Sequence, residues 1–384
     1  MAMTVRVGVQ PTMLLWARSR SSLTVADLAH RFPKLEEWER GDRQPTLNQL
    51  EDFANATHTP IGMLFLAEPP EEFIPIPDFR TIGDHGVSRP TPDLLDTVFL
   101  CQQRQEWYRD FARTNGVESL PFVGSLSVSS DIVESADLMR EVLTFGVEER
   151  RRISSWSEAF RTLSEHSEVL GVLVMVSGVV GSNTHRVLDP DEFRGFALVD
   201  QLAPVIFING TDTKAAQIFT LAHELAHVWL GETALSNVTI TSTAGNAVER
   251  WCNQVAAELL VPVAAMQDEY RPTGDFETEL DRLARIFKVS TLVILRRIRD
   301  AGGHLPGRFS DLYSTELERV LSFRPAGSGG NFYNTQPVRV SKRFARAVIV
   351  SALEGQTLYR DAYRLLGFKK HATFTEFSHS LGID

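Results

Sequence analysis

Phe219-Thr-Leu-Ala-His-Glu-Leu-Ala-His-Val-Trp229 is the stretch that decides the fold. Almost all of it apart from His223, Glu224 and His227 is apolar, which predicts a buried helix. Residues four apart lie on one face of a helix, so His223 and His227 offer two imidazoles to one metal ion. Glu224 lies about 100° further round, close enough to position a metal-bound water. A metal ion would satisfy these buried polar groups.

The spacing His-Glu-x-x-His is the arrangement of zinc peptidases, in which a catalytic zinc ion has three protein ligands. A second predicted helix over 248–262 offers the third ligand. Glu249 lies 22 positions after His227 (249 − 227), which leaves room for a loop and an antiparallel helix. Glu258 lies near the same face, so spacing alone does not exclude it. Cys252 is a third candidate, although a small buried residue is the favoured interpretation for it.

Four motifs in order resemble the ImmA/IrrE family of bacterial metallopeptidase-like regulators over about 150–300. They are Arg194-Gly-Phe-Ala-Leu-Val199, Ala203-Pro-Val-Ile-Phe-Ile-Asn209, the His-Glu-Leu-Ala-His helix, and E-x-x-C-N-x-V-A-A-E-L-L-V-P from Glu249. The resemblance implies a zinc site made by His223, His227 and Glu249, with Glu224 as general base. One departure is Val255, where the family usually has an aromatic residue; it changes packing and removes no ligand.

The N-terminal segment contains W-E-x-G-x-x-x-P-T-x-x-Q-L over 38–50, which resembles Xre/Cro-type helix-turn-helix domains. That resemblance implies DNA binding in the major groove, with Lys34, Arg40 and Arg43 as candidate contacts. The chain between Ala29 and Trp38 is several residues shorter than usual, however. Residues 13–50 carry six basic and five acidic side chains, a weak charge for binding phosphate. The alternative is a helical module for dimerisation or partner contact.

The composition predicts a globular cytoplasmic protein of two or three domains. The chain has 384 residues, 43% of them hydrophobic and 23% charged. Its net charge of −10 argues against a protein that coats nucleic acid in general. Two cysteines, Cys101 and Cys252, cannot form a disulfide framework. The longest apolar stretch, 170–180, is too short to cross a membrane, and no signal peptide is expected.

The predicted fold is multi-domain, with a helical N-terminal domain, an α+β zincin-like metallopeptidase domain with a small sheet, and a helical C-terminal tail. Residues 339–370 carry eight basic and two acidic side chains, so this tail is predicted to be a solvated surface or a contact for an acidic partner, for nucleic acid or for the acidic body of this chain. The predicted domains are 1–66 helix-turn-helix, 67–119 proline-rich linker and long bracing helix, 120–305 metallopeptidase, 306–337 flexible linker and 338–384 basic helical module.

Hydrophobic periodicity and turn residues also place the individual elements. A long helix is expected to brace the metallopeptidase domain or a homodimer. The apolar helix-turn-helix pattern near residue 290 is expected to be structural. The predicted helices are 91–114, 131–143, 155–167 and a pair within 280–298; the predicted strands are 170–176, 196–199 and 205–209.

Two functional hypotheses follow from the sequence. The first is a zinc-dependent regulatory endopeptidase that cleaves a repressor partner. The second is an antitoxin-like DNA-binding or scaffold protein that neutralises a toxin encoded nearby, such as a PIN-type nuclease, without proteolysis. An intact Glu224 favours the first hypothesis, because a purely structural metal site gains nothing obvious from it.

Overall fold

The fold is described from a computed structural model. The chain divides into two compact units, Met1–Pro75 with Ser88–Val98, and Ile76–Val87 with Phe99–Asp384. Within the described part of the chain, no helix combines the length and the apolar character needed to cross a membrane. The described residues are 6–21, 23–77, 90–236, 247–272, 274–322 and 332–383.

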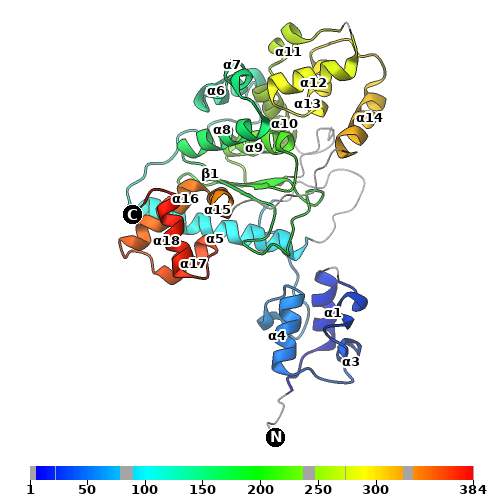
Figure 1. Ribbon diagram of the computed structural model, residues 1–384, viewed down its shortest axis with the longest axis vertical. Coiled ribbons are helices and arrows are strands. Elements are labelled where there is room, and N and C mark those ends of the chain that lie inside the picture. Colours follow the sequence, from blue (N-terminus) through cyan, green and yellow to red (C-terminus); the bar gives the residue numbers. More distant parts are fainter. Residues whose placement is uncertain are drawn as a thin grey trace. The chain divides into compact units, whose positions relative to one another are not determined.

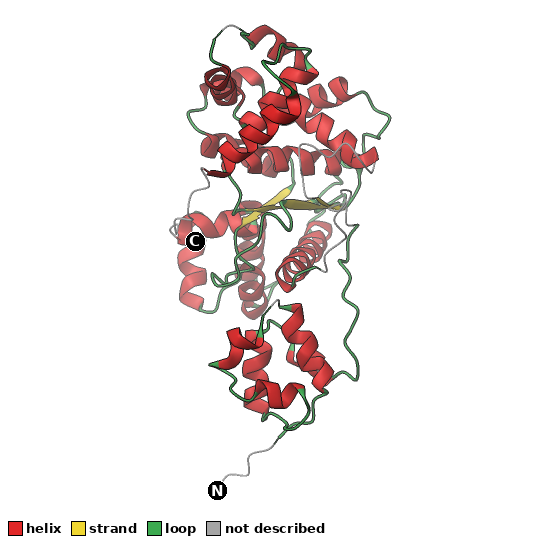
Figure 2. Ribbon diagram, turned by 90° about the vertical axis from the view of Figure 1, so that its right-hand side faces the viewer, coloured by secondary structure: helices red, strands yellow, loops and turns green. Residues whose placement is uncertain are grey.

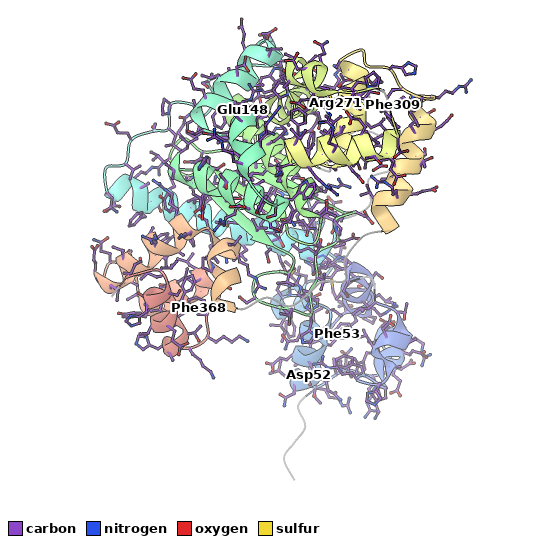
Figure 3. The ribbon with its side chains drawn as sticks, turned by 45° about the horizontal axis from the view of Figure 1, so that its top comes forward. Asp52, Phe53, Glu148, Arg271, Phe309 and Phe368 are labelled. Atoms are coloured by element: carbon purple, nitrogen blue, oxygen red, sulfur yellow. The ribbon has the colours of Figure 1, made fainter. Side chains whose placement is uncertain are left out.

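The N-terminal unit is built from short helices around a small apolar core that includes Phe53, labelled in Figure 3. The hydroxyls of Thr24 and Thr46 accept the backbone N–H groups of Asp27 and Gln49, so each threonine caps the N-terminus of its helix. Its elements are α1 Pro11–Arg20, α2 Val25–Ala29, α3 Leu35–Glu39, α4 Leu47–Ala56 and the 3-10 helix η1 Ile61–Phe65.

A mixed four-stranded sheet lies at the centre of the second unit, between layers of helices (Figure 2). The strand order is β1-β3-β2-β4; β1 and β3 are parallel, and β2 is antiparallel to both β3 and β4. Strands β1 to β3 are buried throughout, which explains why they are continuous apolar runs. The strands are β1 Leu173–Ser177, β2 Gly195–Leu198, β3 Val205–Asn209 and β4 Ala234–Ser236.

Three of these strands were predicted, and β3 has the expected bounds. β1 begins three residues later than expected, because Leu170 still caps the preceding helix and Gly171 has a left-handed backbone with φ of 108°. The fourth strand, β4, has three residues and was not predicted. The sheet and its helices agree with the expected α+β fold.

Helices cover both faces of the sheet (Figure 1). On one face lie α8 and α9, and α10 packs on α9. The expected helices over 131–143 and 155–167 are α6 and α8, and the expected pair is α12 and α13, which meet at Lys288. The helices are α6 Ile132–Val142, α7 Val147–Arg152, α8 Trp156–Val169, α9 Lys214–Leu230, α10 Ala247–Leu260, α11 Val263–Glu269, α12 Phe276–Phe287 and α13 Thr291–Asp300.

The predicted bracing helix is α5, Pro92–Thr114. The side-chain amide of Gln105 donates to the carbonyl oxygens of Leu198 and Ala203, at 2.7 and 2.9 Å. The buried Arg104 donates to the carbonyl oxygen of Leu365 at 3.0 Å. Helix α5 therefore joins the sheet to the C-terminal helices.

The prediction of a flexible linker over 306–337 is wrong for part of this range, because Phe309–Ser322 form the helix α14. Phe309 and Tyr313 pack against the main core, and the buried Glu316 accepts a hydrogen bond from Thr291. These contacts explain the helix in a segment whose sequence suggested a spacer. The Gly/Ser-rich residues 323–331 lie outside the described residues.

The C-terminal helices belong to the same compact unit as the sheet, whereas the sequence suggested a separate module. Helix α15 packs against β1. Phe368, labelled in Figure 3, makes an edge contact with Phe377, with 5.1 Å between the ring centroids. Arg343 donates to the hydroxyl of Tyr108 on α5 at 2.8 Å. The helices are α15 Phe332–Val340, α16 Lys342–Leu353, α17 Tyr359–Leu366 and α18 His371–Ser380.

Candidate metal centre

Helix α9 carries the candidate metal centre in the middle of the core. The hydroxyl of Thr213 accepts from the backbone N–H of Ala216 and starts the helix, and Gly231 ends it with φ of 78°. Every residue from Gln217 to Trp229 is buried, because the sheet, α8 and α10 surround the helix. The imidazoles of this helix are therefore fixed by packing on all sides.

The structure brings His223, His227 and Glu249 together. The Nε2 atoms of the two histidines are 3.1 Å apart. The Glu249 carboxylate on α10 lies 3.3 Å from Nε2 of His223 and 3.0 Å from Nε2 of His227. One ligand atom from each residue lies within 4.8 Å of the other two.

This arrangement fits a tetrahedral metal ion. Two donor atoms about 2.1 Å from one ion lie about 3.4 Å apart at a tetrahedral angle, close to the distances found here. Two nitrogens and one carboxylate oxygen are the donor set of a catalytic zinc site with one open position. The Nδ1 atom of His223, the ring nitrogen that faces away from the proposed ion, has no hydrogen-bond partner among the described residues.

Burial and charge set the protonation of these groups. Burial lowers the pKa of His227 and outweighs the hydrogen bond to Glu249, which acts in the opposite direction. Burial alone would raise the pKa of Glu249, but the two imidazoles outweigh burial and hold that pKa well below its usual range. A charged carboxylate beside a neutral imidazole is the state that binds a metal cation.

Glu224 lies beside β2, and this neighbour was not predicted from the sequence. A Cβ atom added to Gly195 would lie 3.3 Å from the Oε1 atom of Glu224 and 2.7 Å from the Cγ2 atom of Thr220. Any larger residue at position 195 would therefore push on the Glu224 carboxylate. A glycine inside a strand pattern indicates such close approach, and it was the available signal in the sequence.

The rival ligands have other roles. Glu258 pairs with the buried Arg297 and accepts the backbone N–H of Val263 at 3.2 Å. Burial, with the nearby Glu249 and Glu224 carboxylates, raises the pKa of the Cys252 thiol well above its usual range. Glu258 is therefore engaged elsewhere, and Cys252 is a buried neutral thiol.

The candidate DNA contacts surround α3 in the N-terminal unit. Lys34 directly precedes this helix. Arg40 pairs with Asp42 at 2.9 Å, and Arg43 lies 3.5 Å from the carboxylate of Glu37. Both arginines are thus partly neutralised by acids of the same unit.

The comparison with known proteins covers the region that holds this centre. Residues 167–299 match the IrrE N-terminal-like domain, a metallopeptidase domain, which implies a metal ion. His223, His227 and Glu249 form a possible metal site within the matched range. The chain is also similar to the radiation response metalloprotease IrrE of Deinococcus radiodurans, with 34% identity over 99 residues. That alignment covers 24% of this chain and 30% of the relative.

Two further comparisons concern the rest of the chain. Residues 340–380, which comprise most of the C-terminal helices, match a domain of unknown function (DUF8813). No solved structure matches the chain. The metallopeptidase assignment therefore applies to the central part of the second unit.

Proposed function

We propose that this chain is a zinc-dependent endopeptidase that cleaves a regulatory partner protein. The observation that carries the proposal is the convergence of His223, His227 and Glu249, with Glu224 on the same helix as the two histidines. The match of residues 167–299 to the IrrE N-terminal-like domain supports the same reaction class.

Each residue of the centre has a separate role in the proposed reaction. His223, His227 and Glu249 hold the zinc ion, which when bound polarises the scissile carbonyl and makes water more acidic. Glu224 takes a proton from the attacking water and delivers it to the leaving amide nitrogen. Gly195 leaves room for the Glu224 carboxylate beside β2, because a Cβ atom at this position would lie 3.3 Å from its Oε1 atom.

The proposed substrate is a repressor-type protein encoded nearby, in the cytoplasm. The N-terminal unit is proposed to be a helix-turn-helix-type module. Its helix α3 contains Glu36, Glu37 and Glu39, and acids pair with Arg40 and Arg43. This charge pattern favours a protein contact, with a partner or a second copy of the chain, over an operator contact.

A scaffold or antitoxin-like role is the second candidate. It is favoured by the complete burial of His223, Glu224 and His227, each with 0% exposed surface. In that case the metal would stabilise the fold, and a toxin-like partner would bind without being cut.

One experiment separates these two functions. The chain is co-expressed with the neighbouring gene's product as wild type, as Glu224→Gln, and as the exposed control Glu165→Gln. Bound partner is weighed by intact mass, and zinc is measured in each protein. We expect the partner to be cut by wild type and Glu165→Gln, and to be intact with Glu224→Gln, which retains zinc.

Loss of the Glu224 proton transfer should slow cleavage by roughly 100-fold or more. A partner that stays intact with all three proteins would favour the scaffold role. Cleavage by Glu224→Gln at the wild-type rate would contradict the proposed mechanism.

A further inference from the structure

Most of the candidate metal centre is buried in the described part of the chain. His223, Glu224 and His227 are 0% exposed, and the Glu249 side chain is 15% exposed. A peptide bond must come within hydrogen-bond reach of Glu224 to be cut. Some part of the chain therefore has to move before a protein substrate can bind.

Strand β4 is the edge strand beside β2, which approaches Glu224. Gly195 of β2, which approaches the Glu224 carboxylate, is paired with Ser236 of β4. Ala197 of β2 is paired with Ala234. Extended peptides commonly bind proteins by adding a strand to a sheet edge. Beside Glu224, β4 occupies the place on β2 that such a peptide would take.

The other edge of β4 is held by the segment that follows the N-terminal unit. The backbone N–H of Leu235 donates to the carbonyl oxygen of Pro77 at 2.9 Å. Ile76 is 7% exposed, although Pro75 and Pro77 on either side of it are exposed. A buried apolar anchor and a backbone hydrogen bond thus fix this short segment, Ile76–Pro77, on the second unit.

We propose that Ile76–Pro77 is an autoinhibitory latch, which keeps β4 on the edge of β2 and so excludes a substrate strand from Glu224. The regulatory meaning of the latch rests on the proposed peptidase function. Its effect on the exposure of the centre does not, and it can be measured without any substrate.

The chemistry of the latch makes it reversible. Pro75 and Pro77 have no backbone N–H, so they cannot extend a hydrogen-bonded ladder along β4. β4 itself has three residues, which gives it few hydrogen bonds to β2. The latch directly follows Pro75, the last residue of the first segment of the N-terminal unit. A partner protein bound to that unit would act on one end of the latch and release β4.

The test compares the full-length wild-type chain with Ile76→Asp, which places a charge at the buried anchor. Phe73→Asp is the matched control, because Phe73 lies in the same segment and is 71% exposed. Hydrogen exchange of the Leu235 amide reports whether the hydrogen bond from β4 to Pro77 of the latch is kept. After treatment with a chelator, the rate at which diethyl pyrocarbonate modifies His223 and His227 reports access to the centre.

We expect Ile76→Asp to exchange the Leu235 amide, and to be modified at His223 and His227, at least tenfold faster than wild type. Phe73→Asp should behave as wild type. If Ile76→Asp does not fold, Ile76→Ala takes its place, with a smaller change in the same direction.

Unchanged exchange and modification would overturn the proposal. Faster exchange at Leu235 with unchanged histidine modification would also overturn it, because the segment would then only protect a sheet edge. If the proposed peptidase function is wrong, no variant cuts the co-expressed partner, but exchange and modification still decide whether the latch exists. If both proposals hold, Ile76→Asp cuts that partner faster than wild type.

Discussion

At the scale of single residues, the two glutamates of α10 allow a direct test of the metal centre. Glu249 lies against two imidazoles, whereas Glu258 pairs with Arg297. We expect Glu249→Gln to lose bound zinc, because it removes an anionic ligand. Glu258→Gln should retain zinc but lose about 1.5–3 kcal/mol of unfolding free energy, because it removes the closer of the two carboxylates that pair with the buried Arg297. Metal content and urea unfolding measure the two effects.

The reverse result, with zinc lost in Glu258→Gln and kept in Glu249→Gln, would show that Glu258 is the metal ligand and Glu249 is not. His223→Ala extends the test. It removes one of the two imidazole ligands, so full zinc occupancy in this variant would contradict the site itself.

The residue scale also shows what the sequence can and cannot predict. The pair His223 and His227 follows from helical periodicity alone, because four residues make about one turn. The expectation that Glu249 and Glu258 share a face of α10 was wrong, because nine positions make about two and a half helical turns and so place the two side chains on opposite faces. The partner of Glu258 is Arg297, which is 39 residues further along the chain. Such a long-range partner leaves no local pattern.

At the scale of elements, the contact between α8 and α16 should make stability depend on pH. Burial raises the pKa of Glu168 to about 7 from its ordinary 4.5, against a hydrogen bond from Ser341 that lowers it. The folded chain therefore binds an extra proton between these values, and the unfolding free energy falls as pH rises through this window. We expect wild type to lose up to about 3 kcal/mol between pH 5 and pH 8, relative to Glu168→Gln.

Urea unfolding at several pH values measures this difference. Glu165→Gln, an exposed change on the same helix, is the control and should follow wild type. Parallel pH profiles for wild type and Glu168→Gln would show that Glu168 titrates normally in the folded chain.

Helix α3 gives a second prediction at this scale, on DNA binding by the N-terminal unit. The double change Glu37→Gln with Asp42→Asn removes the acid that pairs with Arg43 and the closer of the two acids that pair with Arg40. If the unit contacts duplex DNA through α3, the variant should bind DNA more tightly. The slope of the logarithm of the binding constant against the logarithm of the salt concentration should also be steeper by about one for each new phosphate contact. Fluorescence anisotropy with duplex DNA at several salt concentrations measures both quantities.

The control for that prediction is Glu51→Gln with Glu68→Gln, which changes the net charge equally at exposed positions of the same unit. Equal binding by both double variants would indicate a general charge effect, with no role for α3 as a DNA contact.

The elements themselves differ in how well the sequence predicts them. A buried strand such as Val205–Asn209 has a strong local signal, and this strand was predicted. Strand β4 is too short to show an alternating pattern. Helix α14 was taken for a linker, because its stability comes from packing of Phe309 and Tyr313 against a distant core.

At the scale of the whole molecule, the two compact units should unfold separately. Phe53 is buried in the core of the N-terminal unit, whereas Phe344 contacts Trp107 and Tyr108 in the second unit. Calorimetry of the full chain should show two transitions. Phe53→Ala and Phe344→Ala should each remove about 3–5 kcal/mol from one transition and leave the other in place.

The position of the C-terminal helices makes this prediction specific. Because α16 contacts α5 and the end of α8, Phe344→Ala should lower the transition that also contains the metal centre. Added zinc should raise that same transition and no other, since a ligand stabilises the unit that binds it. A third transition that responds to Phe344→Ala but not to zinc would show that the C-terminal helices fold independently of the metal centre.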